Sequence, residues 1–414
     1  VCGAKVGPDY IAPTFHTFSA KKTAINLDEW AMRPALRAMM LESVGGESSL
    51  MIAEGTMGLY DGIGPLGFGS TADLAKSVGW PVVLVVDARG ASTSIAVLLQ
   101  GFAKYRDDIN LVGIIANRVG SANHAELIKN ACKHINPDVK FLGAIPRDER
   151  LVLPSRYLGL VQAVEHPELE DFIDDTANLV ERGIDLDLLL SLARPAKMTQ
   201  DFMATPPIPP LGQRIAVARD MAFGFAYPFI ISAWRAAGAE IAFFSPMMDE
   251  APDPSCDAVY LCGGYPELHI SRIAHAHNFR TGMKEAVDRG AFVYGECGGY
   301  MVLGEALVDG GGVAHEMLGM LPLVSSFADR RLHLGYRRAR LEKSSILGRQ
   351  GEYYRGHEFH YAGIVQENPA DALFDMTDAM GNNLGKCGLI RGRVMGSFIH
   401  LIDHENSIAQ QFGQ

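Results

Sequence analysis

One proline-rich segment divides this chain of 414 residues near its middle. Prolines occupy positions 206, 207, 209 and 210, shortly after Arg194-Pro195. Because proline lacks a backbone N–H and fixes φ, such a run can form neither a helix interior nor a central strand. It is typical of a linker between domains. We therefore predict a first domain over residues 1–193, a linker over residues 194–212 and a second domain over residues 213–414.

The composition suits two soluble α/β domains and excludes several classes of protein. Hydrophobic residues make up 48% of the chain, which is enough to fill two cores. The net charge of -11 leaves no basic surplus for general nucleic-acid binding. No apolar run reaches the length of a membrane span, and no signal peptide is visible. The six cysteines show no CxxC spacing, which argues against a zinc or disulfide framework and predicts a cytoplasmic protein.

Short apolar runs alternate with helical patterns in both halves of the chain. The clearest strand covers residues 81–87, and another over 109–116 ends just before Asn117. The pattern restarts at residue 214, so we predict two doubly wound α/β domains. Residues 1–35 instead predict loops after the tail of a strand. Because the chain begins with Val1 and not Met, we also expect a segment upstream of it.

Polar residues follow two predicted strands of the first half. Lys5 and Asp9 lie just beyond the first strand, and Glu54 ends a strand over residues 50–53. A glycine-rich loop then runs to Asp61. Parallel sheets bind ligands at these strand ends, and acidic groups there suit Mg²⁺ held together with substrate phosphates. The alternative is an ordinary solvated loop.

The segment Ala291–Met301 predicts a nucleophile elbow. An apolar strand over residues 291–294 meets a tight turn, Gly-Glu-Cys-Gly-Gly, and a helix follows from Tyr300. A strand, a sharp turn and a helix expose the side chain at the tip, here Cys297. The positive end of the helix is expected to favour the thiolate form of Cys297. The alternative is a buried structural cysteine beside a glycine-rich turn.

A cysteine nucleophile needs a base, and a histidine of the same domain is the obvious candidate. His400 is the best of these, because it follows Gly396-Ser397 near the end of a late strand. His357 and His360 are rivals that share one polar strand, and we interpret them as substrate-binding or structural groups. The glycine-rich turn over residues 261–267 could present its backbone N–H groups to an anion.

With these motifs in this order, the second half resembles a class I glutamine amidotransferase of the Cys-His type. The first-half motifs extend the resemblance over nearly the whole chain, to the a,c-diamide synthases of cobalamin biosynthesis. Those enzymes join a dethiobiotin-synthetase-like ATP domain to the amidotransferase domain. Residues 332–336 resemble the aerobic-pathway branch of the family. The segments that carry the resemblance are residues 5–10, 54–62, 261–267, 295–299, 356–360 and 396–400.

The resemblance implies ATP- and glutamine-dependent amidation of the a and c carboxylates of hydrogenobyrinic acid. It implies that Cys297 and His400 are catalytic. The implied oxyanion hole consists of Gly263, Gly264 and Gly298. The implied contacts to ATP, phosphate and substrate are Lys5, Asp9, Tyr10, Asp61 and Asn117. Glu54 and Asp9 would hold Mg²⁺. The protein would act in the cytoplasm without nucleic-acid or membrane partners, and a homodimer is one assembly compatible with the resemblance.

The chain departs from the family pattern at two places. It lacks the glycine-rich phosphate loop, which we expect in the upstream segment. Many class I amidotransferases place a glutamate two residues after the histidine, where this chain has Ile402, so another group must orient His400. Three alternatives stay open: the same reaction on cobyrinic acid or another tetrapyrrole, a catalytically silent nucleotide- or tetrapyrrole-binding protein, and a glutaminase that supplies a partner synthetase.

Overall fold

The computed structural model describes residues 1–45, 50–156, 159–197 and 205–405. The chain separates into two compact units. Unit 1 comprises Val1–Glu29 and Leu41–Asp201, and unit 2 comprises Trp30–Met40 and Phe202–Gln414. Residues 198–204 of the predicted linker lie outside the described residues. The sequence gives no sign that Trp30–Met40, which precedes most of unit 1, groups with unit 2.

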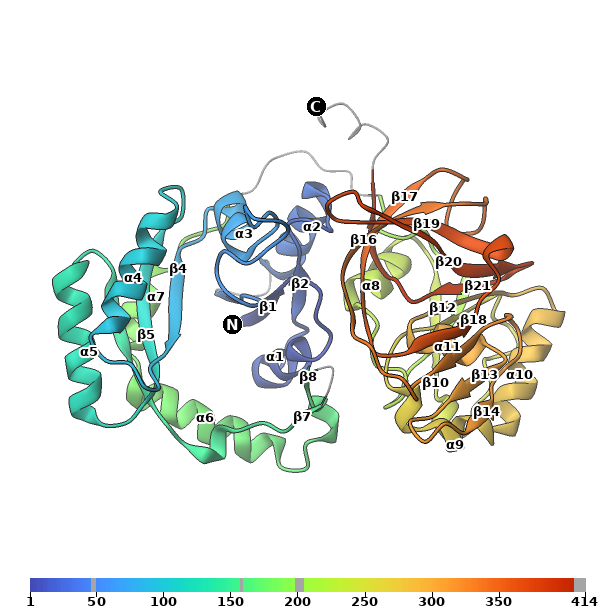
Figure 1. The fold of residues 1–414 in the computed structure, drawn as a ribbon, viewed down its shortest axis with the longest axis horizontal. Helices are drawn as coiled ribbons and strands as arrows, with labels where there is room; N and C mark the ends of the chain where they lie inside the picture. Colours follow the sequence, from blue (N-terminus) through green and yellow to red (C-terminus); the bar gives the residue numbers. More distant parts are fainter. Residues whose placement is uncertain (46–49, 157–158, 198–204, 406–414) are drawn as a thin grey trace. The chain divides into compact units, whose positions relative to one another are not determined.

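Unit 1 is an alternation of strands and helices, as the sequence pattern predicts (Figure 1). Its strands are β1 (Cys2–Val6), β2 (Ile25–Leu27), β3 (Met51–Glu54), β4 (Val82–Asp87), β5 (Leu111–Val119), β6 (Lys140–Pro146), β7 (Ser155–Arg156) and β8 (Gly159–Leu160). Its helices are α1 (Ala12–Ala20), α3 (Thr71–Val78), α4 (Ser94–Tyr105), α5 (Ala122–Ile135), α6 (Leu169–Gly183) and α7 (Leu186–Leu192). Across the described part of the chain, no helix combines the length and the apolar character that crossing a membrane requires.

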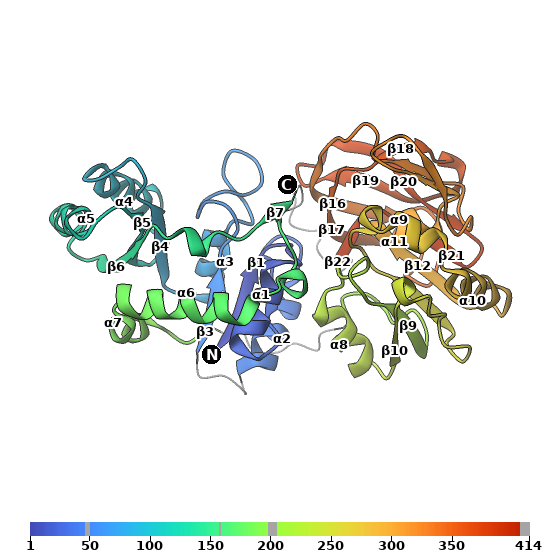
Figure 2. The same cartoon turned by 90° about the horizontal axis from the view of Figure 1, so that it is seen from below.

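Strands β1 to β6 of unit 1 form two parallel sheets, in the orders β2-β1-β3 and β4-β5-β6. Helices cover both faces of the second sheet (Figures 1 and 2). Ile95 and Leu99 of α4 pack with Ile128 of α5 on one face. Ile184 and the apolar residues of α6 and α7 pack on the other. These buried layers confirm the predicted parallel α/β architecture.

The prediction of loops over residues 1–35 is wrong. Helix α1 and strand β2 form there, and helix α2 (Pro34–Gly45) begins within the same stretch. Pro13 and Pro34 stand in the first turns of these helices, where a missing backbone N–H breaks no hydrogen bond. Asp9 assists by accepting hydrogen bonds from the backbone N–H groups of Ile11 and Ala12 at 2.8 and 3.0 Å.

Unit 2 is built on one mixed sheet of ten strands. The strands are β9 (Arg214–Ala218), β10 (Glu240–Phe244), β11 (Ala258–Leu261), β12 (Phe292–Glu296), β16 (His333–Leu341), β17 (Tyr353–His360), β19 (Ala372–Asp378), β20 (Asn383–Arg391), β21 (Val394–Ser397) and β22 (His400–His404). A smaller sheet holds β13 (Ala306–Val308), β14 (Ala314–Glu316), β15 (Val324–Ser326) and β18 (Gly363–Gln366). The helices are α8 (Pro228–Ala236), α9 (Ile270–Ala274), α10 (His277–Asp288) and α11 (Gly298–Leu303).

The order of the large sheet is β10-β9-β11-β12-β21-β20-β19-β16-β17-β22. The part from β10 to β21 is parallel, and the rest is antiparallel. Only Phe398 and Ile399 separate β21 from β22 in the chain, although β22 is the last strand of the sheet. Because so short a link spans only a few ångströms, the antiparallel part must curl back toward β21. That curl returns His400 to the carboxyl ends of the parallel strands.

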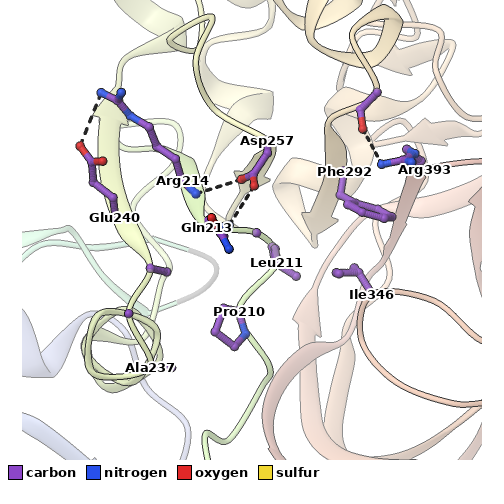
Figure 3. Close-up of a pocket in the computed structure, with 14 residues that line it drawn as sticks. Pro210, Leu211, Gln213, Arg214, Ala237, Glu240, Asp257, Phe292, Ile346 and Arg393 are labelled. Atoms are coloured by element: carbon purple, nitrogen blue, oxygen red, sulfur yellow. Dashed lines mark hydrogen bonds and ion pairs between the residues drawn. The ribbon is translucent and has the colours of Figure 1, made fainter.

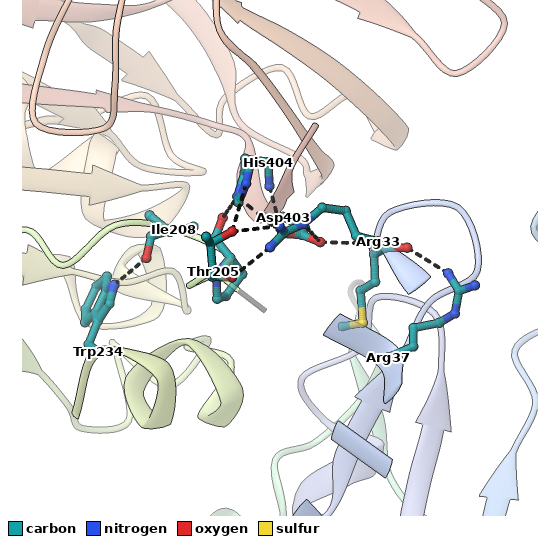
Figure 4. A network of polar contacts seen from close by, with 9 residues as sticks. Arg33, Arg37, Thr205, Ile208, Trp234, Asp403 and His404 are labelled. Atoms are coloured by element: carbon teal, nitrogen blue, oxygen red, sulfur yellow. Dashed lines mark hydrogen bonds and ion pairs between the residues drawn. The ribbon is translucent and has the colours of Figure 1, made fainter. Parts of the chain in front are cut away.

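Arg33 fastens the segment Trp30–Met40 to the strand that carries His400 (Figure 4). Its guanidinium forms an ion pair with Asp403 of β22, with an Nη2–Oδ1 distance of 2.9 Å. Its backbone N–H donates to Oδ2 of Asp403 at 2.8 Å, and Nη1 donates to the hydroxyl of Thr205 at 2.9 Å. The Asp403 side chain is 1% exposed, so the charge of Arg33 balances a carboxylate that water does not reach.

We predict that Arg33→Ala lowers the free energy of unfolding of unit 2 by about 3 to 5 kcal/mol, because it leaves Asp403 buried without its counter-ion. Urea denaturation monitored by tryptophan fluorescence measures the change. Arg331→Ala is the matched control, since it breaks an exposed pair with Asp329 and should cost less than about 1 kcal/mol. Equal losses in the two variants would contradict a structural role for the Arg33–Asp403 pair.

Candidate active site

The elbow around Cys297 has the predicted order of strand, turn and helix. Strand β12 ends at Glu296, and helix α11 begins at Gly298. Cys297 lies between them with φ 48° and ψ -106°, a conformation that costs energy for a residue with a side chain. The turn fits only because Gly299 lacks a Cβ, which would lie 1.9 Å from the carbonyl oxygen of Leu261. The Cys297 N–H donates to the Ser397 carbonyl at 2.9 Å, which fixes the turn against β21.

The imidazole of His400 has two close neighbours at the same end of the sheet. On one side it stacks on His357 of β17, with ring centroids 4.9 Å apart and planes at 12°. Gly263 lies at the Cε1 edge of the ring, where an added Cβ would be 2.4 Å from Cε1 of His400. Any side chain at position 263 would therefore displace the ring. The His400 residue is 1% exposed, so its orientation is set by protein groups and not by bulk water.

A buried carboxylate, Glu296, faces the same histidine. Its Oε2 lies 4.0 Å from Nδ1 of His400, and the residue is 1% exposed. It accepts hydrogen bonds from the hydroxyls of Tyr260 and Tyr294 at 2.7 and 3.0 Å. It also accepts one from the backbone N–H of Leu401 at 3.1 Å. Glu296 was not among the predicted site residues, although a glutamate at the end of an apolar strand is a signal in the sequence.

Burial dominates the titration of the cysteine and the histidine. It raises the pKa of the Cys297 thiol far above its usual value, and the negative charge of Glu267 raises it further. The backbone N–H of Gly298 at the helix N-terminus lowers this pKa, as predicted, but desolvation of the thiolate outweighs that contribution. Burial, followed by the nearby His357, holds the pKa of His400 well below its usual value. Resting Cys297 is a neutral thiol beside a neutral imidazole.

The three glycines predicted for the oxyanion hole lie together with these groups. A Cβ on Gly298 would be 3.1 Å from the backbone nitrogen of Gly264, so the two backbones approach closely. Gly263 precedes Gly264 and lies against the ring of His400. The turn after β11 and the first residue of α11 therefore meet beside Cys297. Backbone N–H groups placed in this way can stabilise the oxyanion of a tetrahedral intermediate.

The rival histidines occupy supporting positions. Nε2 of His357 lies 3.0 Å from the hydroxyl of Tyr227. The ring of His360 stacks on Phe398, with centroids 4.1 Å apart. Burial lowers the pKa of each of these histidines to about 3, with the charge of Arg337 as a further cause at His357 and that of His333 at His360. Both are neutral packing groups near neutral pH, and His357 also holds the plane of the His400 ring.

In unit 1 the structure brings Lys5, Asp9 and Glu54 together at the carboxyl ends of β1 and β3. Lys5 and Glu54 are register partners on neighbouring strands. Nζ of Lys5 lies 3.0 Å from Oε1 of Glu54 and 3.7 Å from Oδ2 of Asp9. Nε2 of His16 lies 2.8 Å from the other Glu54 oxygen, and His16 reaches it from helix α1, where a loop was predicted. Although partial burial raises the pKa of Glu54, the hydrogen bond with His16 and the charge of Lys5 give a net lowering.

Asp61 and Asn117, which were also predicted for the nucleotide site, make their contacts elsewhere in unit 1. Tyr10 follows Asp9 in the loop before α1. Asp61 accepts a hydrogen bond from the Gly58 N–H at 2.8 Å within its own loop. Asn117 belongs to β5 in the second sheet of unit 1, where it pairs in register with Asp87. The structure therefore groups Lys5, Asp9 and Glu54 at the end of one sheet, whereas Asn117 belongs to the other sheet of unit 1.

Asp9 and Glu54 could form part of a metal site whose other ligands come from substrate phosphates and water. Within residues 1–45, 50–156, 159–197 and 205–405, no group of three His, Cys, Asp or Glu side chains could hold an ion. Mg²⁺ nevertheless needs only one or two carboxylates when substrate phosphates and water complete its shell. Asp9 and Glu54 both reach Lys5 Nζ, so their carboxylates face a common region. That geometry fits a magnesium ion held together with phosphate.

A cavity of about 910 Å³ lies at the amino ends of the parallel strands of the large sheet (Figure 3). Its lining includes Arg214, Glu240, Asp257 and Phe292, which stand at or just before the starts of the parallel strands. The charges of this lining already have partners: Asp257 accepts from the Gln213 and Arg214 N–H groups at 3.0 and 2.9 Å. Parallel sheets bind ligands at the carboxyl ends of their strands, where Cys297 lies, and this cavity lies at the amino ends.

Each half of the chain matches a known protein-family model. Residues 1–160 match the CobQ/CobB/MinD/ParA nucleotide binding domain, and residues 214–407 match the CobB/CobQ-like glutamine amidotransferase domain. A solved structure of PurLQS from Thermotoga maritima is 16% identical, with a TM-score of 0.33, over 46% of this chain and 87% of that one.

Curated relatives match almost the whole chain. A hydrogenobyrinate a,c-diamide synthase of Brucella anthropi is 51% identical over 406 residues, which cover 96% of this chain and 90% of the relative. Another protein of that name, from Rhizobium meliloti, is 49% identical over 97% of this chain and 92% of its own length. At this identity and coverage, the chain belongs to the hydrogenobyrinate a,c-diamide synthase family.

Proposed function

We propose that this protein uses ATP and the amide nitrogen of glutamine to convert the a and c carboxylates of hydrogenobyrinic acid into amides. The observation that carries the proposal is the meeting of Cys297, His400 and the glycines of two turns at one end of the sheet in unit 2. The relatives named for this reaction, and the nucleotide-binding match of residues 1–160, support the ATP-dependent half.

In unit 2 the chemistry begins with proton transfer from the Cys297 thiol to the neutral imidazole of His400. The sulfur attacks the side-chain carbonyl carbon of glutamine, and backbone N–H groups of Gly264 and Gly298 stabilise the oxyanion. The imidazolium then returns its proton to the leaving nitrogen, and ammonia departs. Water, deprotonated by His400, hydrolyses the remaining thioester to glutamate and restores the thiol.

In unit 1 the proposed step is transfer of the ATP γ-phosphoryl group to a carboxylate oxygen of the corrinoid. Lys5 would neutralise charge that develops on the phosphoryl oxygens, and Asp9 and Glu54 would hold Mg²⁺. The ion supplies charge neutralisation of the ATP phosphates when bound. Ammonia then attacks the acyl phosphate, the C–O bond to phosphate breaks, and the amide forms. Tyr10, Asp61 and Asn117 stay predictions for contacts to nucleotide or substrate, as do the cytoplasmic location and the homodimer.

We predict that Cys297→Ser abolishes glutamine-dependent amidation, by about three orders of magnitude or more, but retains amidation with ammonium chloride. The serine hydroxyl is a poor nucleophile here, while added ammonia bypasses the glutamine site. Mass spectrometry of the corrinoid product measures both reactions. Cys256→Ser is the matched control, because it changes another buried cysteine, near the amino ends of the parallel strands, and should retain both activities. Substantial glutamine use by Cys297→Ser would remove the nucleophile assignment.

We predict that Glu54→Gln loses both the glutamine-dependent and the ammonia-dependent amidation, because it weakens phosphate and metal binding in unit 1. Release of glutamate from glutamine should persist in the same preparation, which shows that unit 2 remains folded. Glu126→Gln, which alters an exposed pair with Lys129, is the control and should retain amidation. Normal ammonia-dependent amidation by Glu54→Gln would exclude Glu54 from the phosphate site.

A further inference from the structure

We propose that Glu296 positions His400 and stabilises its imidazolium form during glutamine cleavage, in place of an acid on the strand of the histidine. This inference rests on the proposed function of Cys297 and His400. Glu296 directly precedes Cys297 in the chain. The same elbow would therefore supply both the thiol, at the tip of the turn, and the carboxylate that orients His400, at the end of β12.

The geometry of Glu296 supports this role. Its Oε2 is 4.0 Å from Nδ1 of His400, which leaves Nε2 as the nitrogen available to Cys297. The carboxylate cannot turn away, because Tyr260, Tyr294 and the Leu401 N–H all donate hydrogen bonds to it. Leu401 follows His400 in β22, so the same carboxylate holds both the backbone and the ring of this strand start.

The strand of the histidine offers no competing acid. Ile402 occupies the position two residues after His400 and is 1% exposed among apolar neighbours. Asp403 is held by Arg33, with an Nη2–Oδ1 distance of 2.9 Å. Glu405 is held by Arg338 and Arg355, at 2.8 and 2.7 Å. Each of these carboxylates has a cationic partner, whereas the cation that Glu296 would face is the imidazolium formed in the reaction.

The burial of Glu296 predicts how this pair titrates. Desolvation raises the pKa of Glu296 to about 7, against the opposing hydrogen bonds from Tyr260, Leu401 and Tyr294. Above that pH the carboxylate is ionised and can stabilise a proton on His400. The titratable groups facing Glu296 and His400 from the surrounding elements are Tyr260, Cys262, Tyr294, Cys297, His357 and His360. Burial raises the pKa values of the tyrosines and cysteines and lowers those of His357 and His360, so Glu296 should govern the acid limb of the rate.

The test is glutamate release from glutamine by Glu296→Gln, measured as kcat and KM from pH 5 to pH 9. We expect kcat near pH 8 to fall by about 100-fold or more, with KM changed by less than about threefold, because Glu296 is 1% exposed and its carboxylate is held by Tyr260, Tyr294 and the Leu401 N–H. The wild type should lose activity below about pH 7, and this acid limb should disappear from Glu296→Gln. Glu296→Asp should recover part of kcat and retain an acid limb.

Glu367→Gln is the matched control, because Glu367 is another largely buried carboxylate that accepts a hydrogen bond from a tyrosine, Tyr300. It should retain the wild-type acid limb and most of the activity. An unchanged acid limb in Glu296→Gln, with a loss no larger than in Glu367→Gln, would overturn the proposal. If Glu296→Gln does not fold, Glu296→Asp decides: a reduced kcat with an acid limb at a shifted pH supports the proposal, and a kcat and an acid limb equal to those of the wild type overturn it. Retained glutamate release by Cys297→Ser would instead overturn the proposed function.

Discussion

The close approach of two backbone turns at the end of the parallel strands is the constraint on which unit 2 depends. The turn after β11 and the elbow after β12 meet where a Cβ on Gly299 would lie 1.9 Å from the Leu261 oxygen. A second glycine, Gly263, leaves room for the ring of His400. Because no side chain fits between these segments, the cysteine, the imidazole and the backbone N–H groups are held within one small volume.

The same close packing sets the electrostatics of the site. The residues Glu296, Cys297 and His400 are each no more than 2% exposed, so every charged form is penalised. Burial therefore favours a neutral thiol and a neutral imidazole, and we propose that backbone donors and the Glu296 carboxylate stabilise the charge that proton transfer between them creates.

Much of this arrangement could be predicted from the sequence, because its parts are local. The strand-turn-helix pattern located Cys297, and the alternation of apolar runs predicted the parallel sheets. Glu296 and Arg33 could not be assigned roles in this way. Their partners, His400 and Asp403, lie over a hundred residues away and reach them only because the antiparallel part of the sheet curls back. The helix α1 was missed for a different reason, since its proline, Pro13, occupies a first turn in which it breaks no hydrogen bond.

We propose that the sulfur of Cys297 carries the glutamyl group, that His400 accepts and returns the proton, and that Glu296 stabilises the protonated imidazole. The most direct measurement is peptide mass spectrometry of enzyme quenched in acid during turnover with isotopically labelled glutamine. The account predicts one labelled glutamyl thioester, located on the peptide that contains Cys297. A glutamyl group on any of the other five cysteines, or ammonia release at a normal rate with no labelled Cys297 detectable, would contradict it.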